Sequence, residues 1–180
     1  DLANEDAGFV SVKFDDVIAE GMIKKEIVIN PEIGRYTKYL SEADDVILNA
    51  SIMKLREIQS IYQANNIGVK PLLLVQLPSE SSDMSALDET KLEQIKKYLE
   101  EKEDITIENG KLGIWLSDEK YNTEGIEDND NNVEVLIFKQ AIALGWDCPR
   151  AQILVMFREI KSKIFEVQTV GRILRTPGAK

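Results

Sequence analysis

The sequence contains no histidine and only one cysteine, Cys148, among its 180 residues. Without histidine, Ser-His-Asp catalysis is excluded and a zinc site loses its commonest ligand. A single cysteine excludes an internal disulfide framework and is typical of a reducing compartment, so we expect a cytoplasmic protein. No apolar run approaches the roughly 20 residues that cross a bilayer, which predicts a soluble chain without membrane contact.

The charge of the chain is unevenly divided. Residues 133–180 hold eight Lys/Arg and four Asp/Glu, a net charge of +4, whereas the first 132 residues hold 14 and 28, a net charge of −14. A basic C-terminal quarter could bind a polyanion that the acidic body repels, although ordinary unevenness of surface charge gives the same pattern. The chain begins at Asp1 without a signal-like stretch, so we expect a piece of a longer polypeptide.

Apolar patterning predicts strands that alternate with helices. Strand-like segments occupy residues 25–30, 71–78, 111–117, 133–139 and 151–157. Helical spacing occupies residues 41–65 and 87–102 and returns from residue 164, and residues 14–23 suit a short helix. This alternation predicts an α/β fold with a mainly parallel sheet flanked by helices. The acidic, amide-rich residues 118–132 are predicted to form an exposed loop with scope for motion.

The carboxyl ends of the predicted strands are the expected location of a ligand site. In open parallel sheets, ligands bind beyond these ends. The loops that follow Gln76, Lys139 and Phe157 are therefore the first candidates.

The terminal segment "FEVQTVGRILRTPG", residues 165–178, gathers polar side chains on one helical face. Gln168, Arg172 and Arg175 follow at i, i+4 and i+7, which spans a sector of about 60°. Gly171 lets a backbone or a ligand approach closely. Guanidinium forks suit phosphate oxygens, so the pair predicts contact with a phosphate group. The alternative is a solvated helix face, or ion pairs with acidic neighbours such as Glu166.

A second informative stretch is "FKQAIALGWDCPRAQILVMF", residues 138–157. Gly145 permits a tight approach, and Pro149 fixes the chain into the next strand. Asp147 between them could accept hydrogen bonds from ribose hydroxyls or orient an arginine, or it could cap its own backbone as an Asx turn. Trp146 suits packing as well as base stacking.

Together these stretches resemble motifs V and VI of superfamily 2 helicases and translocases. Motif VI, Q-x-x-G-R-x-x-R, is matched by Gln168, Gly171, Arg172 and Arg175. Motif V, G-x-D-x-P, is matched by Gly145, Asp147 and Pro149. Within the superfamily, "IFKQAIALGWDCPRAQILVMFREI" is most similar to the restriction subunit of type III restriction-modification enzymes. "VIAEGMIKKEIVIN" and "KPLLLVQLP" resemble the same subunit more loosely, the latter at the position of motif IV.

The resemblance implies that residues 41–180 form the second of two RecA-like lobes and that residues 1–40 link it to the first. ATP and Mg²⁺ would be held mainly by the first lobe, and the further partners would be DNA and the modification (methyltransferase) subunit. The residues that would complete the ATP site are Arg172 and Arg175 as arginine fingers, Gln168 near the γ-phosphate, and Gly145, Asp147 and Gly171 at the nucleotide. The residues that would face nucleic acid are Lys139, Gln140, Gln76 and Ser79. Many superfamily members carry threonine in place of Lys139.

Several motifs that such an enzyme needs are missing from this sequence. It contains no G-x-x-x-x-G-K-[ST] phosphate loop, no D-E-x-H-like acidic motif and no metal-dependent nuclease signature. We therefore expect the chain alone neither to hydrolyse ATP nor to cleave DNA. Two alternatives stay open. One is a lobe of another superfamily 2 repair or phage helicase. The other is a non-catalytic α/β protein-interaction module, in which the arginine pair binds an acidic partner and the loop 118–132 provides the contact surface.

Overall fold

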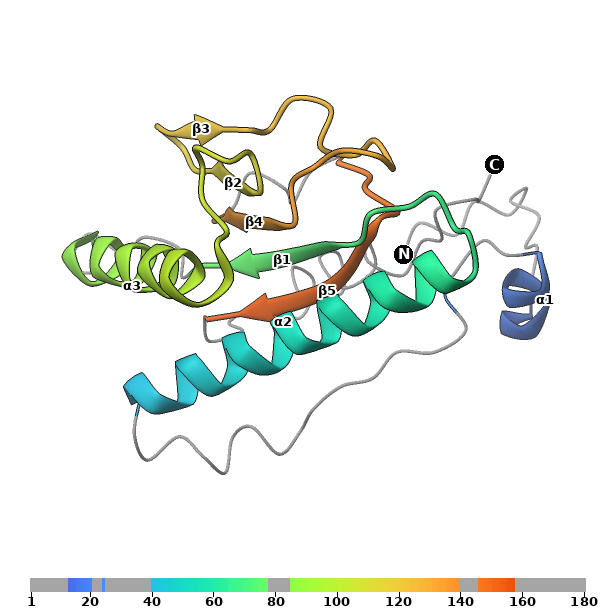
Figure 1. Cartoon of the computed structure of the whole chain (residues 1–180), viewed down its shortest axis with the longest axis horizontal. Helices are drawn as coiled ribbons and strands as arrows, with labels where there is room; N and C mark the ends of the chain where they lie inside the picture. Colours follow the sequence, from blue (N-terminus) through green and yellow to red (C-terminus); the bar gives the residue numbers. More distant parts are fainter. Residues whose placement is uncertain (1–12, 21–23, 25–39, 78–84, 140–145, 158–180) are drawn as a thin grey trace, which may run out of the picture.

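The computed structural model describes residues 13–20, 24, 40–77, 85–139 and 146–157. Three helices lie in this part of the chain: α1 (Phe14–Ala19), α2 (Leu40–Ala64) and α3 (Ser85–Glu103). Its strands are β1 (Leu72–Gln76), β2 (Leu112–Trp115), β3 (Lys120–Tyr121), β4 (Val135–Phe138) and β5 (Ala151–Met156). Figure 1 shows the sheet with α2 running along it and α3 near the ends of the strands.

The five strands form one sheet in the order β3-β2-β4-β1-β5. β2, β4, β1 and β5 are parallel, and only the two-residue β3 is antiparallel to its neighbour. The predicted α/β class with a mainly parallel sheet is confirmed. β1 is central, and all five of its residues are buried, because a strand with cover on both faces accommodates a continuous apolar run such as "LLLV".

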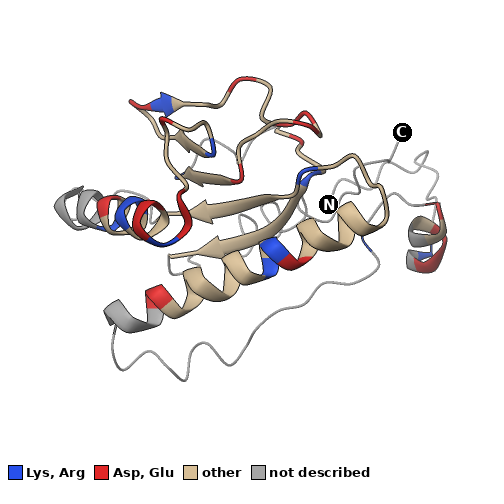
Figure 2. Cartoon of the chain, in the orientation of Figure 1, with Lys and Arg blue, Asp and Glu red and all other residues tan. Residues whose placement is uncertain are grey.

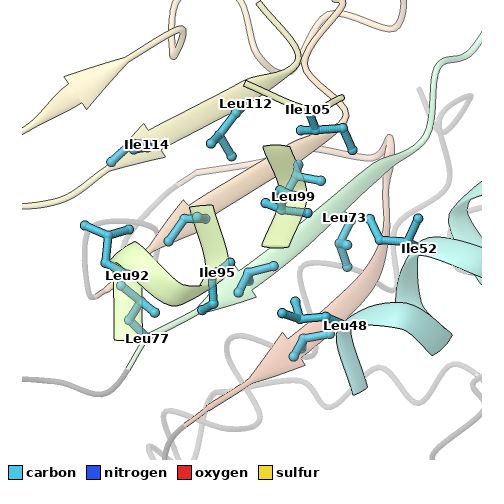
Figure 3. Packing of buried hydrophobic residues seen from close by; sticks show 14 of the residues in the cluster. Leu48, Ile52, Leu73, Leu77, Leu92, Ile95, Leu99, Ile105, Leu112 and Ile114 are labelled. Carbon is cyan, nitrogen blue, oxygen red and sulfur yellow. The ribbon is translucent and has the colours of Figure 1, made fainter. Parts of the chain in front are cut away.

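Helices α2 and α3 cover the same face of the sheet. Leu48, Ile52 and Leu55 recur on α2 at the spacing of one helical face, and α3 does the same with Leu92, Ile95 and Leu99. These side chains pack against the strand residues Leu73, Val75, Ile114 and Ile137 and against Leu77, which follows β1 (Figure 3). Because the helical spacing is visible in the sequence, the predicted helices 41–65 and 87–102 correspond closely to α2 and α3.

A second apolar cluster lies on the opposite face of the sheet. Its strand residues include Leu72, Leu74 and Phe138, which alternate along β1 and β4 with residues of the first cluster. Cys148 and Ile126, from the segments that precede β5 and β4, complete its buried part. This face is therefore covered in part by connecting segments of the chain.

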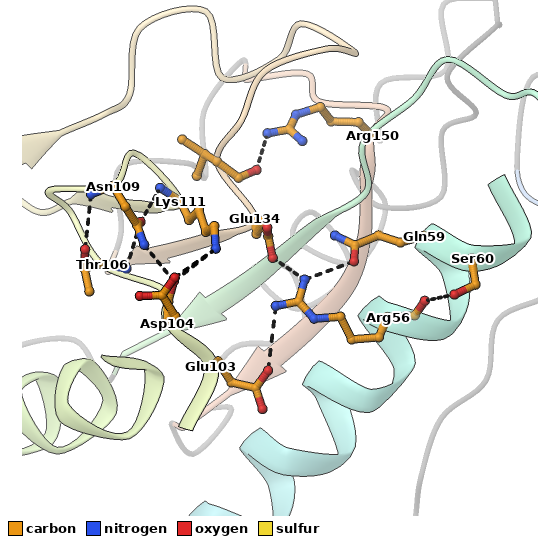
Figure 4. Close-up of polar contacts among 11 residues, drawn as sticks. Arg56, Gln59, Ser60, Glu103, Asp104, Thr106, Asn109, Lys111, Glu134 and Arg150 are labelled. Carbon is orange, nitrogen blue, oxygen red and sulfur yellow. Dashed lines mark hydrogen bonds and ion pairs between the residues drawn. The ribbon is translucent and has the colours of Figure 1, made fainter. Parts of the chain in front are cut away.

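Arg56 joins three elements at the amino-terminal side of the sheet. Its Nη1 forms an ion pair with Glu134, which precedes β4, and donates to Gln59 Oε1 at 3.0 Å. Its Nη2 lies 3.7 Å from Glu103 Oε2 at the end of α3 (Figure 4). The guanidinium thus connects α2, α3 and the entry to β4 through carboxylates that are far away in the sequence.

The predicted loop 118–132 is more ordered than its composition indicates. It contains β3, and Ile126 within it is fully buried. Asn131 donates to the carbonyl of Gly125 at 2.9 Å and accepts from the amide of Val133 at 2.9 Å. The loop prediction missed this because amide side chains that bond to the backbone hold a turn as firmly as apolar contacts do.

The other predicted elements have mixed outcomes. The four longer strands, β1, β2, β4 and β5, match the predicted strands 71–78, 111–117, 133–139 and 151–157, and α1 lies within the predicted helix 14–23. The predicted strand 25–30 and the helix predicted from residue 164 lie outside the described residues.

None of the described helices combines the length and apolar character that crossing a membrane requires.

Candidate functional site

The described parts of the connections that follow β1 and β4 lie on opposite faces of the sheet. The chain passes from β1 to β2 through α3, whose apolar side packs on the first face. The segment that enters β5 after β4 places Cys148 and Trp146 on the second face. Because β1 and β4 are neighbours, the sheet has a topological switch point between their carboxyl ends, which is where open α/β sheets bind ligands.

The backbone at this switch point is held by hydrogen bonds between the strand ends. The amide of Leu77 donates to the carbonyl of Phe138 at 2.8 Å, and the amide of Phe157 donates to the carbonyl of Gln76 at 2.9 Å. Gln76 Nε2 also donates to the carbonyl of Lys139, at 3.4 Å. Residues at the ends of β1, β4 and β5 are therefore brought together. The loops after Gln76, Lys139 and Phe157, where the sequence predicts a ligand site, begin here, but nearly all of their residues lie outside the described part of the chain.

The resemblance implies that Gln76 faces nucleic acid, but its side chain is fully buried. Alternation along β1 directs it to the same face as Leu72 and Leu74, which belong to the second cluster. Its Oε1 accepts no hydrogen bond among the described residues. A direct contact between Gln76 and nucleic acid would require this amide to become exposed. The Lys139 side chain, by contrast, is half-buried.

Lys91 is a second cation at the carboxyl end of the sheet. It forms an ion pair with Asp44 on α2, and its Nζ lies 4.7 Å from the centre of the Phe157 ring. Burial lowers the pKa of Lys91, which shows that the ammonium is partly removed from water. The ion pair and the aromatic contact offset that cost and tie α2 and α3 to the end of β5.

Asp147 lies in the segment that enters β5 from the opposite end of the sheet. Its side chain is exposed, and three residues later the carbonyl of Arg150 accepts from the amide of Leu72 at the start of β1. Trp146 packs edge-on against Trp115, with ring centroids 6.3 Å apart and planes at 75°. The described structure therefore gives Trp146 the packing role that the sequence left open.

Cys148 lies in a strongly desolvated region beside Asp147. Its Sγ is 3.8 Å from the carbonyl oxygen of Ile126, and burial raises its pKa to about 11, with Arg150 opposing the shift. Lys24 donates to the carbonyl of Ala151 at 2.6 Å, and burial lowers the pKa of Lys24 to about 8. Both shifts favour the neutral form, as expected where water is excluded.

We predict that Cys148 reacts slowly with thiol reagents in the folded protein. At pH 8, a pKa of about 11 instead of 9 lowers the thiolate fraction by about 100-fold, and burial slows access further. Ellman's reagent should therefore modify Cys148 at least ~100-fold more slowly in buffer than in urea at the same pH. Equal rates in the two solutions would contradict the burial of this thiol. Below pH 9 the thiol is neutral in both the folded and the unfolded state. Between about pH 9 and pH 11 only the unfolded state ionises, so the free energy of unfolding should fall over this range.

Most residues that the resemblance assigns to the nucleotide lie outside the described part of the chain. These are Gly145, Gln168, Gly171, Arg172 and Arg175, and the same holds for the predicted nucleic-acid contacts Ser79 and Gln140. The described residues at the switch point present no set of donors that would by itself hold a triphosphate. Among the described residues, no three His, Cys, Asp or Glu side chains are placed to hold a metal ion.

The sequence reasoning missed two residues that organise the described structure. Arg150 is fully buried, and Trp115 forms one side of the aromatic pair. An arginine immediately before an apolar strand, and a tryptophan that ends one, were the available signals.

Comparison of the chain with protein-family models, curated proteins and solved structures gives no significant match.

Proposed function

We propose that this chain is the second motor lobe of an ATP-dependent DNA helicase or translocase. The observation that carries the proposal is the meeting of β1 and β4 at a switch point. β1 is the strand whose sequence resembles motif IV, and β4 leads into the segment that resembles motif V. A switch point is a suitable place for residues that couple a nucleotide to a nucleic-acid track.

The proposed parent protein is the restriction subunit of a type III restriction-modification enzyme. In this proposal residues 41–180 are a RecA-like lobe, residues 1–40 lead into it from the first lobe, and the first lobe holds most of the ATP and Mg²⁺ site. Arg172 and Arg175 extend from this lobe toward the triphosphate. The modification subunit and DNA are the partners, and the complex works in the cytoplasm.

The contribution of this lobe is positional. Residues on the two lobes form one ATP site only when the lobes close. Each cycle of closing and reopening therefore moves the lobes relative to each other, and this movement would advance the protein along DNA. ATP would supply the free energy for that cycle. Among the described residues, the hydrogen bonds that join the ends of β1, β4 and β5 would keep this edge rigid during the movement.

The polypeptide that carries both lobes provides the test. Its steady-state ATP hydrolysis should increase when duplex DNA is added, whereas this chain alone should show no hydrolysis. A Walker A lysine in the preceding lobe would agree with the proposal. A parent protein without ATPase activity would favour the non-catalytic interaction module, and activity without a modification subunit would favour another superfamily 2 helicase.

A further inference from the structure

Two tryptophans and a lysine meet at the β2 side of the sheet, and we call them the tryptophan corner. Trp115 on β2 is paired in register with Lys120 on β3. Lys120 Nζ lies 4.9 Å from the centre of the Trp115 ring. The planes of the Trp146 and Trp115 rings meet at 75°, so the two indoles pack edge to face. Both indoles are half-buried, whereas Lys120 is exposed.

The corner has the chemistry of a cation-binding site. An indole face attracts an ammonium or guanidinium group through its quadrupole, and tryptophan is the strongest of the aromatic side chains in this respect. Among the described residues Lys120 forms no ion pair, and its ammonium lies over the Trp115 ring instead. Lys120 lies on the edge strand β3 and its side chain is exposed, so its ammonium can leave the Trp115 ring without disturbing the sheet.

The surroundings of the corner are strongly acidic. Residues 118–132 carry six Asp/Glu and one lysine, a net charge of −5, and all six carboxylates are exposed. The six are Asp118, Glu119, Glu124, Glu127, Asp128 and Asp130. Figure 2 shows a blue segment at β3, with red segments beside it and along the loop that follows. Such a surface attracts cations and repels the phosphates of nucleic acid.

The acidic stretch is also held in a defined shape. Ile126 is buried beneath it, and the carbonyl of Ile126 accepts from Arg150 Nε at 2.7 Å. The amide of Lys70 donates to the carbonyl of Asn129 at 2.7 Å, which fixes the other end of the loop. A rigid charged surface loses less conformational entropy on binding than a mobile one does.

We propose that the tryptophan corner and residues 118–132 bind a Lys/Arg-rich segment of a protein partner. One cationic side chain of the partner replaces Lys120 over Trp115, and the carboxylates pair with its other cations. Lys120 then acts as an internal competitor that keeps the site occupied until the partner arrives. The corner adjoins the proposed DNA track, because Trp115 is paired with Phe138, the residue before Lys139, but the proposal does not depend on the motor function.

Intrinsic fluorescence can test the proposal directly, because Trp115 and Trp146 are the only tryptophans of the chain. The full chain is titrated with a peptide of six lysines, and with a single-stranded oligonucleotide in parallel. The peptide should change the emission spectrum in a saturable way that weakens with added salt. The oligonucleotide should bind more weakly than the peptide, because the carboxylates of residues 118–132 repel phosphates. Peptide binding that leaves the emission unchanged, or an oligonucleotide that binds equally well, would overturn the proposal.

Three variants separate the corner from general charge attraction. Lys120→Gln should tighten peptide binding by about two- to fivefold, because the internal competitor is removed. Lys97→Gln removes the same charge from an exposed site on α3 and should have a smaller effect. Trp115→Phe keeps an aromatic ring but binds cations less strongly, so affinity should fall by about two- to fivefold. Equal effects of the two lysine variants, or unchanged affinity of Trp115→Phe, would show that the corner takes no part.

Discussion

Replacing Arg172 with alanine in the two-lobe polypeptide is expected to lower the kcat of DNA-stimulated ATP hydrolysis by roughly 10³- to 10⁵-fold. The reason is electrostatic. A guanidinium that reaches the transferring phosphoryl group offsets the negative charge that develops there, and this charge is larger in the transition state than in bound ATP. The loss should therefore be found in kcat, with a much smaller change in KM. A coupled assay with saturating DNA measures both.

Two further variants make this result specific. Arg172→Lys keeps the charge but loses the planar fork, so most of the loss should remain. Lys180→Ala removes a positive charge five residues beyond Arg175 and should hydrolyse ATP at nearly the original rate. If Arg172→Ala folds normally and keeps its kcat within tenfold, the assignment of this residue as an arginine finger is wrong.

Replacing Arg150 with methionine should destabilise the fold by about 3 kcal/mol. The guanidinium is fully buried and donates to three backbone carbonyls: Nε to Ile126 at 2.7 Å, Nη1 to Lys70 at 2.5 Å and Nη2 to Val133 at 2.7 Å. These carbonyls belong to the acidic loop and to the entries of β1 and β4. Methionine preserves much of the apolar stem but leaves all three acceptors without this donor, and each unsatisfied group costs about 1–3 kcal/mol.

The expected loss is smaller than the sum of three such terms, because removing a buried charge also removes its desolvation penalty. That penalty lowers the pKa of Arg150, although the group stays charged at neutral pH. Urea denaturation gives the free energy of unfolding of each variant. Arg56→Met is the matched control: its side chain is 38% exposed, and we expect a loss of about 1 kcal/mol. If both variants unfold with the same free energy, Arg150 does not hold the three segments together.

The elements of this fold could be predicted from the sequence to the extent that they depend on local spacing. The apolar repeat at Leu48, Ile52 and Leu55 marks α2, and the run 71–78 marks β1, because each pattern lies within one segment. The loop 118–132 was predicted less well, since Ile126 contacts a residue 24 positions away, and a window of neighbouring residues does not contain that contact.

The candidate site was predictable in its position but not in its detail. Knowing that strands 71–78 and 133–139 are parallel is enough to place Gln76 and Lys139 at the same edge of the sheet. Whether Gln76 is exposed depends on what covers the second face of β1, and that is decided by other segments. The same holds for Trp146, whose packing partner Trp115 lies on a different strand.

The sequence by itself determined the α/β class, the helical and strand segments and the separation of acidic from basic regions, because these follow from the order of side chains along the chain. Only the tertiary structure decided the strand order, the faces on which the connections run, the burial of Arg150 and the meeting of Trp115, Trp146 and Lys120. These features depend on contacts between distant residues, such as the 80 positions that separate Arg150 from Lys70. Such contacts form only when the whole sheet assembles, since the separate segments have no partner that would fix them.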